Sequence, residues 1–269
     1  MLIASMVIVF ALIIAGALWR TGATEIPQEM RASFSPQDLE VLQDDLNFRK
    51  LVGQIVIISI TFILIYNYVC QFDAGNGLWL AAAEKLGANR LLGLTNPGGS
   101  EQAPCIDPGQ LTSVDLTQVK VSLPQAADLT ICIDFAQKLS DARAKDFIAD
   151  LCLSAPRVLF CAATPHGPPL NEENLQWPSY WASLFAAMGF YPDLSYRLRI
   201  WPDRLISPML RQNSLLYIKR SARFRPSYQL EALDLIHPAL YKTMQQRQVW
   251  FARQLTRSTL QRLFGESIG

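Results

Sequence analysis

The chain has 269 residues, of which half are hydrophobic and only 17% are charged. Soluble domains carry about 25% charged residues, so this composition favours a membrane protein. The 24 Lys+Arg and 23 Asp+Glu leave a net charge of +1, which excludes a general nucleic-acid-binding protein. The two histidines and five scattered cysteines lack the usual spacings of zinc ligands and of disulfide frameworks, so we expect no metal site and reduced, packed thiols.

The first uncharged run covers residues 1–19 and ends at Arg20. As a helix rising about 1.5 Å per residue it would be roughly 28 Å long, close to the thickness of the bilayer core. A signal peptide is the alternative, but it would begin with a basic residue, and this run has none. We therefore expect residues 1–19 to form a transmembrane helix.

A polar linker, residues 20–50, separates this run from a second one. Ser35 followed by Pro36 is typical of a helix start, so the linker is expected to contain a helix. Residues 51–72 again carry no charge and are long enough to form a second transmembrane helix. The alternative for 51–72 is a buried helix that runs into the first strand of a soluble domain.

Residues 73–225 have the pattern of an α/β domain. Strands that alternate with helices indicate a parallel sheet built from right-handed crossovers. The expected elements are helices at 81–86 and 142–153, strands at 90–94, 127–135 and 158–163, and a late antiparallel strand at 215–219.

The remaining residues, 226–269, are expected to form a basic helical tail. Residues 200–269 hold 11 Lys+Arg against 4 Asp+Glu, and residues 245–264 have the pattern of an amphipathic helix. This helix could pack on the domain, or it could contact anionic lipid headgroups or an acidic partner subunit.

A short glycine loop, Asp-Ala-Gly-Asn-Gly at residues 73–77, lies between the second apolar run and the next helix. Nucleotide-binding domains place a glycine loop at this point, because Gly75 and Gly77 would let the backbone approach a cofactor. The N-terminus of the following helix would favour anionic groups.

The loop and the helix after it resemble one bacterial branch of the class I S-adenosylmethionine-dependent methyltransferases. Residues 75–83 (GNGLWLAAA) match the second half of the motif V-D-V-G-C-G-x-G-x-W-L-A-A-A. Further matches follow in family order at 90–93 (RLLG), 113–117 (SVDLT), 128–132 (DLTIC), 158–165 (VLFCAATP), 176–181 (QWPSYW), 189–190 (GF) and 211–213 (RQN). The likeness covers roughly residues 70–220, and it implies a Rossmann-like methyltransferase sheet with flanking helices.

The chain departs from the family pattern at the positions that would hold the cofactor. The family's opening acid falls on Gln71, its first glycine on Asp73, and the acid that ends the second strand on Thr95. A threonine cannot supply the charge-assisted pair of hydrogen bonds that a carboxylate gives to the ribose hydroxyls.

Two further family motifs are also altered. The Glu-His after the fourth strand falls on Gln137-Lys138, and the His-x-Asn-Glu segment falls on residues 172–175 (EENL). Asp115 and Asn174 are the polar contacts that remain. The resemblance therefore implies a vestigial cofactor site at Gly75, Gly77, Thr95 and Asp115.

No residue is assigned a catalytic role. Asp134 is expected near the carboxyl end of a strand, where α/β folds bind ligands, but the sequence offers it no base, metal or second carboxylate at a suitable spacing. His166 lies in a Thr-Pro-His-Gly-Pro-Pro segment and is interpreted as a solvated loop histidine.

The leading hypothesis is a non-catalytic structural or assembly subunit, without a bound cofactor, that uses a decayed methyltransferase fold inside a larger membrane complex. A photosynthetic reaction-centre and antenna assembly or a respiratory complex would fit. Its partners would be membrane-protein subunits, reached through the N-terminal helices and through basic and aromatic surfaces, with lipid headgroups as further contacts. The aromatic candidates are Trp177, Tyr180, Trp181, Trp201 and Trp250.

The alternative is a membrane-bound methyltransferase that uses S-adenosylmethionine on a lipid, sugar or quinone-like substrate. A third interpretation is a different, unidentified ligand in the old pocket. In each case we expect an integral protein of the bacterial inner membrane or of a membrane derived from it. With two spanning helices, the positive-inside rule places the domain outside the cytoplasm, and with one helix it places the domain in the cytoplasm. The reduced cysteines favour the cytoplasm.

Overall fold

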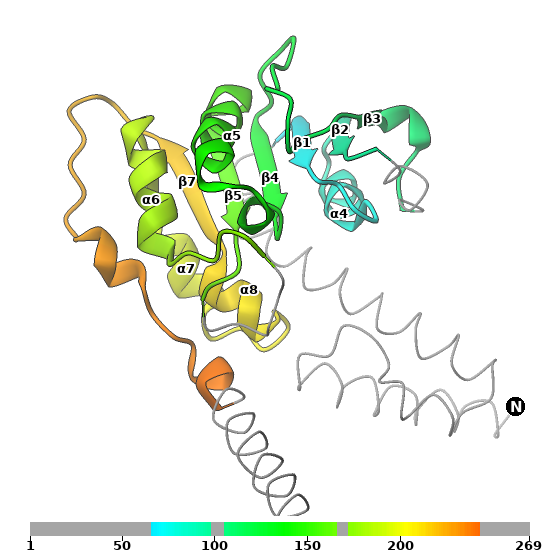
Figure 1. Ribbon diagram of the computed structural model, residues 1–269. Coiled ribbons are helices and arrows are strands. Elements are labelled where there is room, and N and C mark those ends of the chain that lie inside the picture. The colour runs from blue at the N-terminus through cyan, green and yellow to red at the C-terminus, as the bar shows by residue number, and fades with distance from the viewer. Residues whose placement is uncertain (1–65, 98–104, 166–171, 243–269) are drawn as a thin grey trace, which may run out of the picture.

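The computed structural model describes residues 66–97, 105–165 and 172–242 (Figure 1). The expected helix at 1–19, the linker at 20–50 and the tail helix at 245–264 lie outside these residues. Within them, no helix combines the length and the apolar character needed to cross a bilayer.

The domain is built on a seven-stranded sheet with the order β3-β2-β1-β4-β5-β7-β6. All neighbours from β3 to β5 are parallel, whereas β7 runs antiparallel to both β5 and β6. This order, with its one reversed strand, is that of class I methyltransferases, so the expected fold class and the late antiparallel strand are confirmed. The strands are β1 Tyr68–Phe72, β2 Arg90–Thr95, β3 Leu111–Ser113, β4 Leu129–Ile133, β5 Arg157–Cys161, β6 Phe190–Pro192 and β7 Leu215–Lys219.

The first strand lies inside the second uncharged run. Residues 68–72 form β1, which is buried on both faces and pairs with β2 and β4. The prediction of a spanning helix over all of 51–72 is therefore wrong for these five residues, and the alternative that ends the run in a strand is correct there. The carboxylate of Asp128 marks the start of the strand, since it accepts the backbone N–H groups of Asn67 and Tyr68, both at 2.9 Å.

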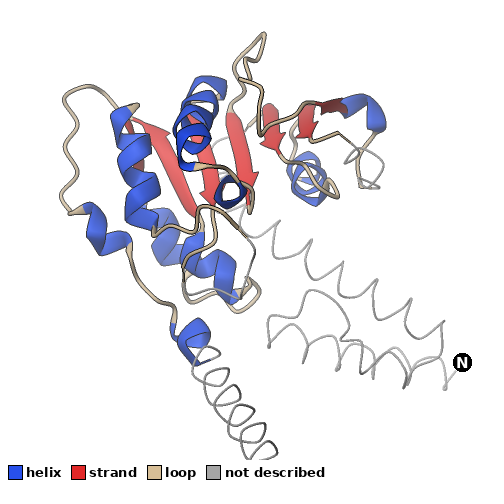
Figure 2. Cartoon of the chain, viewed as in Figure 1, coloured by secondary structure: helices blue, strands red, loops and turns tan. Residues whose placement is uncertain are grey.

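Helices cover both faces of the sheet (Figure 2). Local sequence explains several starts: Ser140 and Ser207 accept an N–H from the first turn of their helices, and α6 and α8 begin at a proline. The predicted helices at 81–86 and 142–153 correspond to α4 and α5. The helices are α4 Leu78–Lys85, α5 Asp141–Ser154, α6 Pro178–Ala187, α7 Leu194–Ile200 and α8 Pro208–Asn213, with 3-10 turns η2 Pro108–Gln110, η3 Ala136–Lys138 and η4 Leu230–Leu233.

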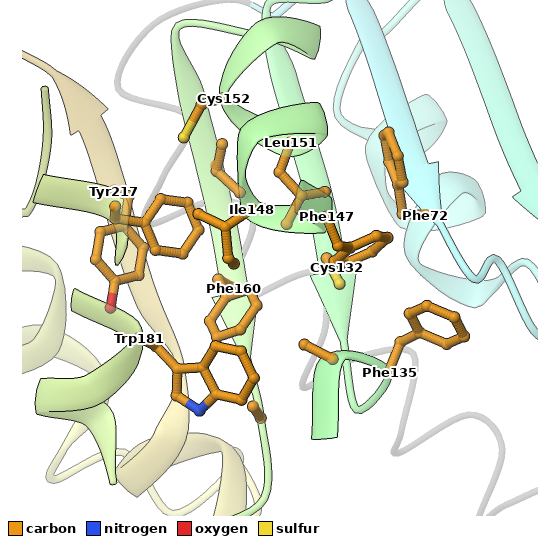
Figure 3. Packing of buried hydrophobic residues seen from close by; sticks show 14 of the residues in the cluster. Phe72, Cys132, Phe135, Phe147, Ile148, Leu151, Cys152, Phe160, Trp181 and Tyr217 are labelled. Carbon is orange, nitrogen blue, oxygen red and sulfur yellow. The ribbon is translucent and has the colours of Figure 1, made fainter. Parts of the chain in front are cut away.

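Alternate residues of each strand supply the core on opposite faces of the sheet. On one face, Phe72, Cys132 and Phe160 pack against α5 and α6 (Figure 3). The Phe160 ring lies 5.3 Å from the ring of Trp181, so this tryptophan belongs to the core and is no interface anchor. On the other face, a second cluster joins strand residues to α4 and α7. Four of the five cysteines are buried in these layers.

Candidate functional site

The candidate site is the carboxyl edge of the sheet between β1 and β4. From β1 the chain continues to β2 and β3 on one side of the sheet, and it then crosses to β4 on the other side of β1. In α/β folds, ligands bind where the strand order reverses in this way. The glycine loop follows β1 here, held by a 2.9 Å hydrogen bond from Ala74 N to Leu94 O and another of 2.9 Å from Gly77 N to Ala74 O. The loop therefore lies where the resemblance predicts it.

The two loop glycines are retained for different reasons. Gly77 caps α4 with φ 77°, and a Cβ added there would lie 3.0 Å from the side chain of Ile106. Gly75 has φ 52° and is exposed, and an added Cβ would meet nothing within 4 Å. Ile106 comes from the connection between β2 and β3, and its contact with the glycine loop has no signal in the sequence.

Asp73 stands where the family motif has its first glycine, and its backbone is glycine-like, with φ 57°. Its carboxylate lies 3.5 Å from the ammonium group of Lys138 in η3. Both residues stand at positions where the family motif has different chemistry, and the structure pairs them with each other across the ends of β1 and β4. The sequence shows each departure separately but not this ion pair.

Gln71 and Thr95, which stand where the family motif has acids, are buried, with exposed fractions of 2% and 1%. The Gln71 side chain donates to the backbone oxygen of Asp73 at 3.3 Å. Within the described part of the chain, Gln71 Oε1 and Thr95 Oγ1 have no hydrogen-bond partner. Both positions therefore offer neutral oxygens where a cofactor-binding domain would offer carboxylates.

Asp115 is engaged by its own loop. Its Oδ1 accepts hydrogen bonds from Thr117 Oγ1 at 2.5 Å and Thr117 N at 3.0 Å, and these bonds lower the pKa of the carboxyl group. The next backbone N–H, that of Leu116, donates to Asn96. Asp115 thus stabilises the turn after β3, which is sufficient reason for an aspartate at this position.

Asp134 lies at the end of β4, also with φ 57°. Burial raises the pKa of its carboxyl group to about 6. A hydrogen bond from the Cys161 thiol, 3.7 Å away, lowers this pKa but does not offset the effect of burial. Glu172 raises the Asp134 pKa further, and burial raises the pKa of Glu172 itself. Glu172, which follows β5 in the chain, is thus near enough for its charge to act on Asp134, a proximity that the spacing of the two residues in the sequence does not indicate.

The segment before α6 meets η3 at the same edge. Asn174 is buried, and its backbone N–H donates to Gln137 O at 2.9 Å, so two motif positions far apart in the chain are adjacent. The Gln137 side chain hydrogen-bonds Glu172. The charged groups of this edge are thus Lys138 and the carboxyl groups of Asp73, Asp134 and Glu172.

The chemistry that this edge can supply is limited. Burial raises the pKa of the Cys132 and Cys161 thiols well above their usual value, so neither is a thiolate nucleophile at neutral pH. Among the described residues, no three His, Cys, Asp or Glu side chains are placed to hold a metal ion. His166 lies outside the described residues. The edge therefore offers hydrogen-bond acceptors, one ammonium group and a carboxyl group that titrates near pH 6.

No protein-family model and no curated protein matches the chain. Solved structures with a similar arrangement include an O-methyltransferase family protein from Burkholderia thailandensis, with 15% identity, 73% of this chain and 64% of that chain covered, and a TM-score of 0.44. Magnesium protoporphyrin IX methyltransferase from Synechocystis PCC 6803, with bound SAH, shares 15% identity over 66% of this chain and 87% of its own, with a TM-score of 0.45.

A third similar structure is the sugar N-methyltransferase KedS8 from Streptoalloteichus sp ATCC 53650, with 10% identity, coverage of 63% and 86%, and a TM-score of 0.48. The chain spans less than two thirds of the length of the Burkholderia protein. The strand order and directions described above carry the assignment. The chain therefore has a class I S-adenosylmethionine-dependent methyltransferase-like fold.

Proposed function

We propose that this chain is a non-catalytic, membrane-anchored structural or assembly subunit that uses a methyltransferase-like domain as a scaffold within a larger membrane complex. The observation that carries the proposal is the ion pair between Asp73 and Lys138. It joins the first residue of the glycine loop to Lys138 in η3, two altered motif positions at the edge where the family resemblance implies a cofactor. A charged side chain here would stand beside the carboxylate of S-adenosylmethionine.

The energetics of the altered site support this proposal. Each lost charge-assisted hydrogen bond removes about 1.5–3 kcal/mol of binding energy, and every 1.4 kcal/mol or so is a factor of ten in affinity. With Gln71 and Thr95 in place of acids and Asp73 in place of glycine, the loss amounts to several orders of magnitude. The fold does not depend on these positions, because its two core layers are apolar.

The proposed membrane anchor rests on sequence. The uncharged run 1–19 is long enough to span a bilayer, whereas the uncharged residues 51–65, which end directly before the described domain, fall short of the roughly 17 residues that a spanning helix needs and suit a supporting contact with it. The basic tail at 226–269 would add contacts with anionic headgroups or an acidic subunit. A photosynthetic or respiratory membrane complex is the proposed setting, and the cytoplasmic face of the membrane is the proposed side.

Calorimetric titration of the detergent-solubilised full chain with S-adenosylmethionine and S-adenosylhomocysteine tests the catalytic part. We expect no measurable heat of binding at micromolar protein. Micromolar affinity would instead support the alternative, a membrane-bound methyltransferase acting on a lipid, sugar or quinone-like substrate. Carbonate extraction and protease protection in sealed vesicles test the anchor and the side of the domain.

A restoration variant makes this test sharper. Gln71→Asp, Asp73→Gly and Thr95→Asp together should recover part of the cofactor affinity, because they return the acids and the glycine that the family motif contains. The matched control is Gln229→Asp with Asp146→Asn, which changes the same two residue types at exposed positions before η4 and on α5. If the folded restoration variant still fails to bind, side-chain packing, such as that of Ile106 on Gly77, closes the pocket as well.

A further inference from the structure

An exposed apolar surface lies around α7 and the segment that follows η4. Of the eight large hydrophobic side chains exposed among the described residues, five fall between residues 198 and 241. We call these five the α7 surface: Leu198, Leu205, Leu235, Ile236 and Tyr241. Leu198 is the most exposed of all eight, at 75%.

These side chains come from two segments that are held together. Arg197 in α7 donates to Leu233 O at 2.7 Å, and His237 Nε2 lies 3.1 Å from Trp201 O. The Trp201 and His237 rings are 4.7 Å apart. Residues 233–237 therefore run alongside the end of α7, at the lower edge of the domain in Figure 1.

The fully exposed charged side chains nearby are three cations and one acid, Glu231, whereas Asp203 and Asp234 are half-buried and hydrogen-bonded within the domain. Arg199, Arg204 and Lys242 are exposed. The Asp203 carboxylate accepts the backbone N–H of Leu205 at 2.9 Å. Asp234 accepts two hydrogen bonds from Ser179, from its backbone N–H at 2.8 Å and its hydroxyl at 2.6 Å. The fully exposed charges beside the apolar side chains are therefore mostly positive.

We propose that the α7 surface lies in the headgroup layer of an anionic bilayer, with its apolar side chains at the acyl boundary and Arg199 and Arg204 at lipid phosphates. Apolar side chains rimmed by Lys and Arg are the composition of interfacial membrane-binding surfaces, whereas the cores of protein–protein interfaces are depleted in charge.

The course of the chain supports a lipid occupant. The uncharged residues 51–65 join the domain at Tyr66, and Tyr66 belongs to the same buried cluster as Tyr196 and Ile200 of α7. A bilayer that holds residues 51–65 would therefore meet the domain on the face of the sheet that α4 and α7 cover. The inference rests on the proposed membrane anchor and names the face of the domain that meets the lipid.

Fluorescence quenching in nanodiscs tests the orientation. The full chain carries Cys105→Ser, which removes the exposed thiol, and Leu198→Cys labelled with bimane; the other four cysteines are buried. The matched control is Leu153→Cys on α5, at a leucine that is 64% exposed. In discs of phosphatidylcholine and phosphatidylglycerol with nitroxide-labelled headgroups, we expect at least about twofold stronger quenching at Leu198 than at Leu153.

Charge reversal tests the lipid phosphates. Arg199→Glu with Arg204→Glu should return the Leu198 quenching to the Leu153 level, whereas the control pair Arg220→Glu with Arg223→Glu, at exposed positions beyond β7, should leave it unchanged. Equal quenching at both labels in chains that have entered the discs overturns the inference and leaves the anchor intact. A chain that does not enter the discs overturns both. A label at Leu198 that is protected from quenchers only in native membranes, and not in nanodiscs, assigns the surface to a protein partner. That result overturns the lipid assignment.

Discussion

Two aspartates at the carboxyl edge of the sheet, Asp73 and Asp134, adopt a left-handed backbone conformation with φ 57°. This conformation suits glycine and is unfavourable for other L-residues by roughly 1–2 kcal/mol, although Asp and Asn tolerate it better than most. Strained residues of this kind concentrate at functional sites. At Asp73 the left-handed backbone stands at the position where the family motif has a glycine, so the local backbone shape agrees with the resemblance.

Substitution at Asp73 should separate backbone strain from charge. Asp73→Gly and Asp73→Ala both remove the partly exposed ion pair with Lys138, which contributes under about 1 kcal/mol. Only alanine keeps a Cβ in the left-handed region, so we expect the glycine variant to be more stable than the alanine variant by about 1 kcal/mol. Urea unfolding of the two variants measures the difference, and equal midpoints would contradict the strained backbone.

The half-buried carboxyl group of Asp134 should make stability depend on pH. Burial raises its pKa from 3.8 in the unfolded chain to about 6 in the folded domain. The folded state then favours the protonated form, so this group's favourable contribution is complete below pH 3.8 and is lost as pH rises through 6.

Asp134→Asn removes the charge and keeps a side chain that tolerates this backbone. It should therefore raise the free energy of unfolding at pH 8 by roughly 1–3 kcal/mol more than at pH 4. Thermal unfolding of both proteins at the two pH values is the measurement. The exposed Asp146→Asn on α5 is the control; a gain of the same size at both pH values would show that burial does not perturb Asp134.

At the scale of elements, long-range contacts determine several boundaries. Asp234, more than fifty residues downstream, accepts the N–H and the hydroxyl of Ser179 in the first turn of α6. A carboxylate at a helix N-terminus satisfies a free backbone donor and interacts favourably with the helix dipole. The start of α6 and the course of residues 230–242 therefore depend on each other.

Asp234→Ala should destabilise the protein by about 1–2 kcal/mol, because it removes both hydrogen bonds to α6. It should also expose the segment after β7 to limited proteolysis, since one of its attachments is lost. Glu231→Ala changes a nearby exposed acid and should do neither. Similar cleavage rates in the two variants would mean that Asp234 does not hold this segment.

The sequence predicts the elements whose patterns are local. Strands β2, β4, β5 and β7 and helix α5 follow from apolar alternation and capping. The first strand is hidden within a continuous apolar run, because periodicity cannot separate a buried strand from a buried helix. Helices α7 and α8 depend on tertiary bonds, such as those from Arg197 to Leu233 O and Gln212 O, which no short window contains.

The site is predictable to a similar degree. Comparison with the family motif identifies Gln71, Asp73 and Thr95 as altered, and the structure places them at one edge. The comparison with the motif does not reveal that Lys138 pairs with Asp73 or that Glu172 lies near Asp134. Each of these contacts joins two separate connections of the sheet.

At the scale of the whole molecule, the proposed function divides the chain into anchor, scaffold and tail. Deletion of residues 1–19 should move much of the protein out of the membrane fraction or weaken its incorporation into a complex, because a run of this length supplies most of the insertion energy. Membrane fractionation and native gel electrophoresis give the two readouts. Full retention of the shortened chain in the complex would transfer the anchoring role to residues 51–65 or to the tail.

The fastening of residues 230–242 has a mechanical consequence. Asp234 ties this segment to α6, Arg197 ties it to α7, and the backbone N–H of His237 donates to Gln212 of α8 at 2.7 Å. Tension applied beyond residue 242 is therefore shared among three helices before it reaches β6 and β7 at the end of the sheet. A partner that pulls on the tail would displace these helices together with the sheet, and the edge strand β6 would not separate from β7 first.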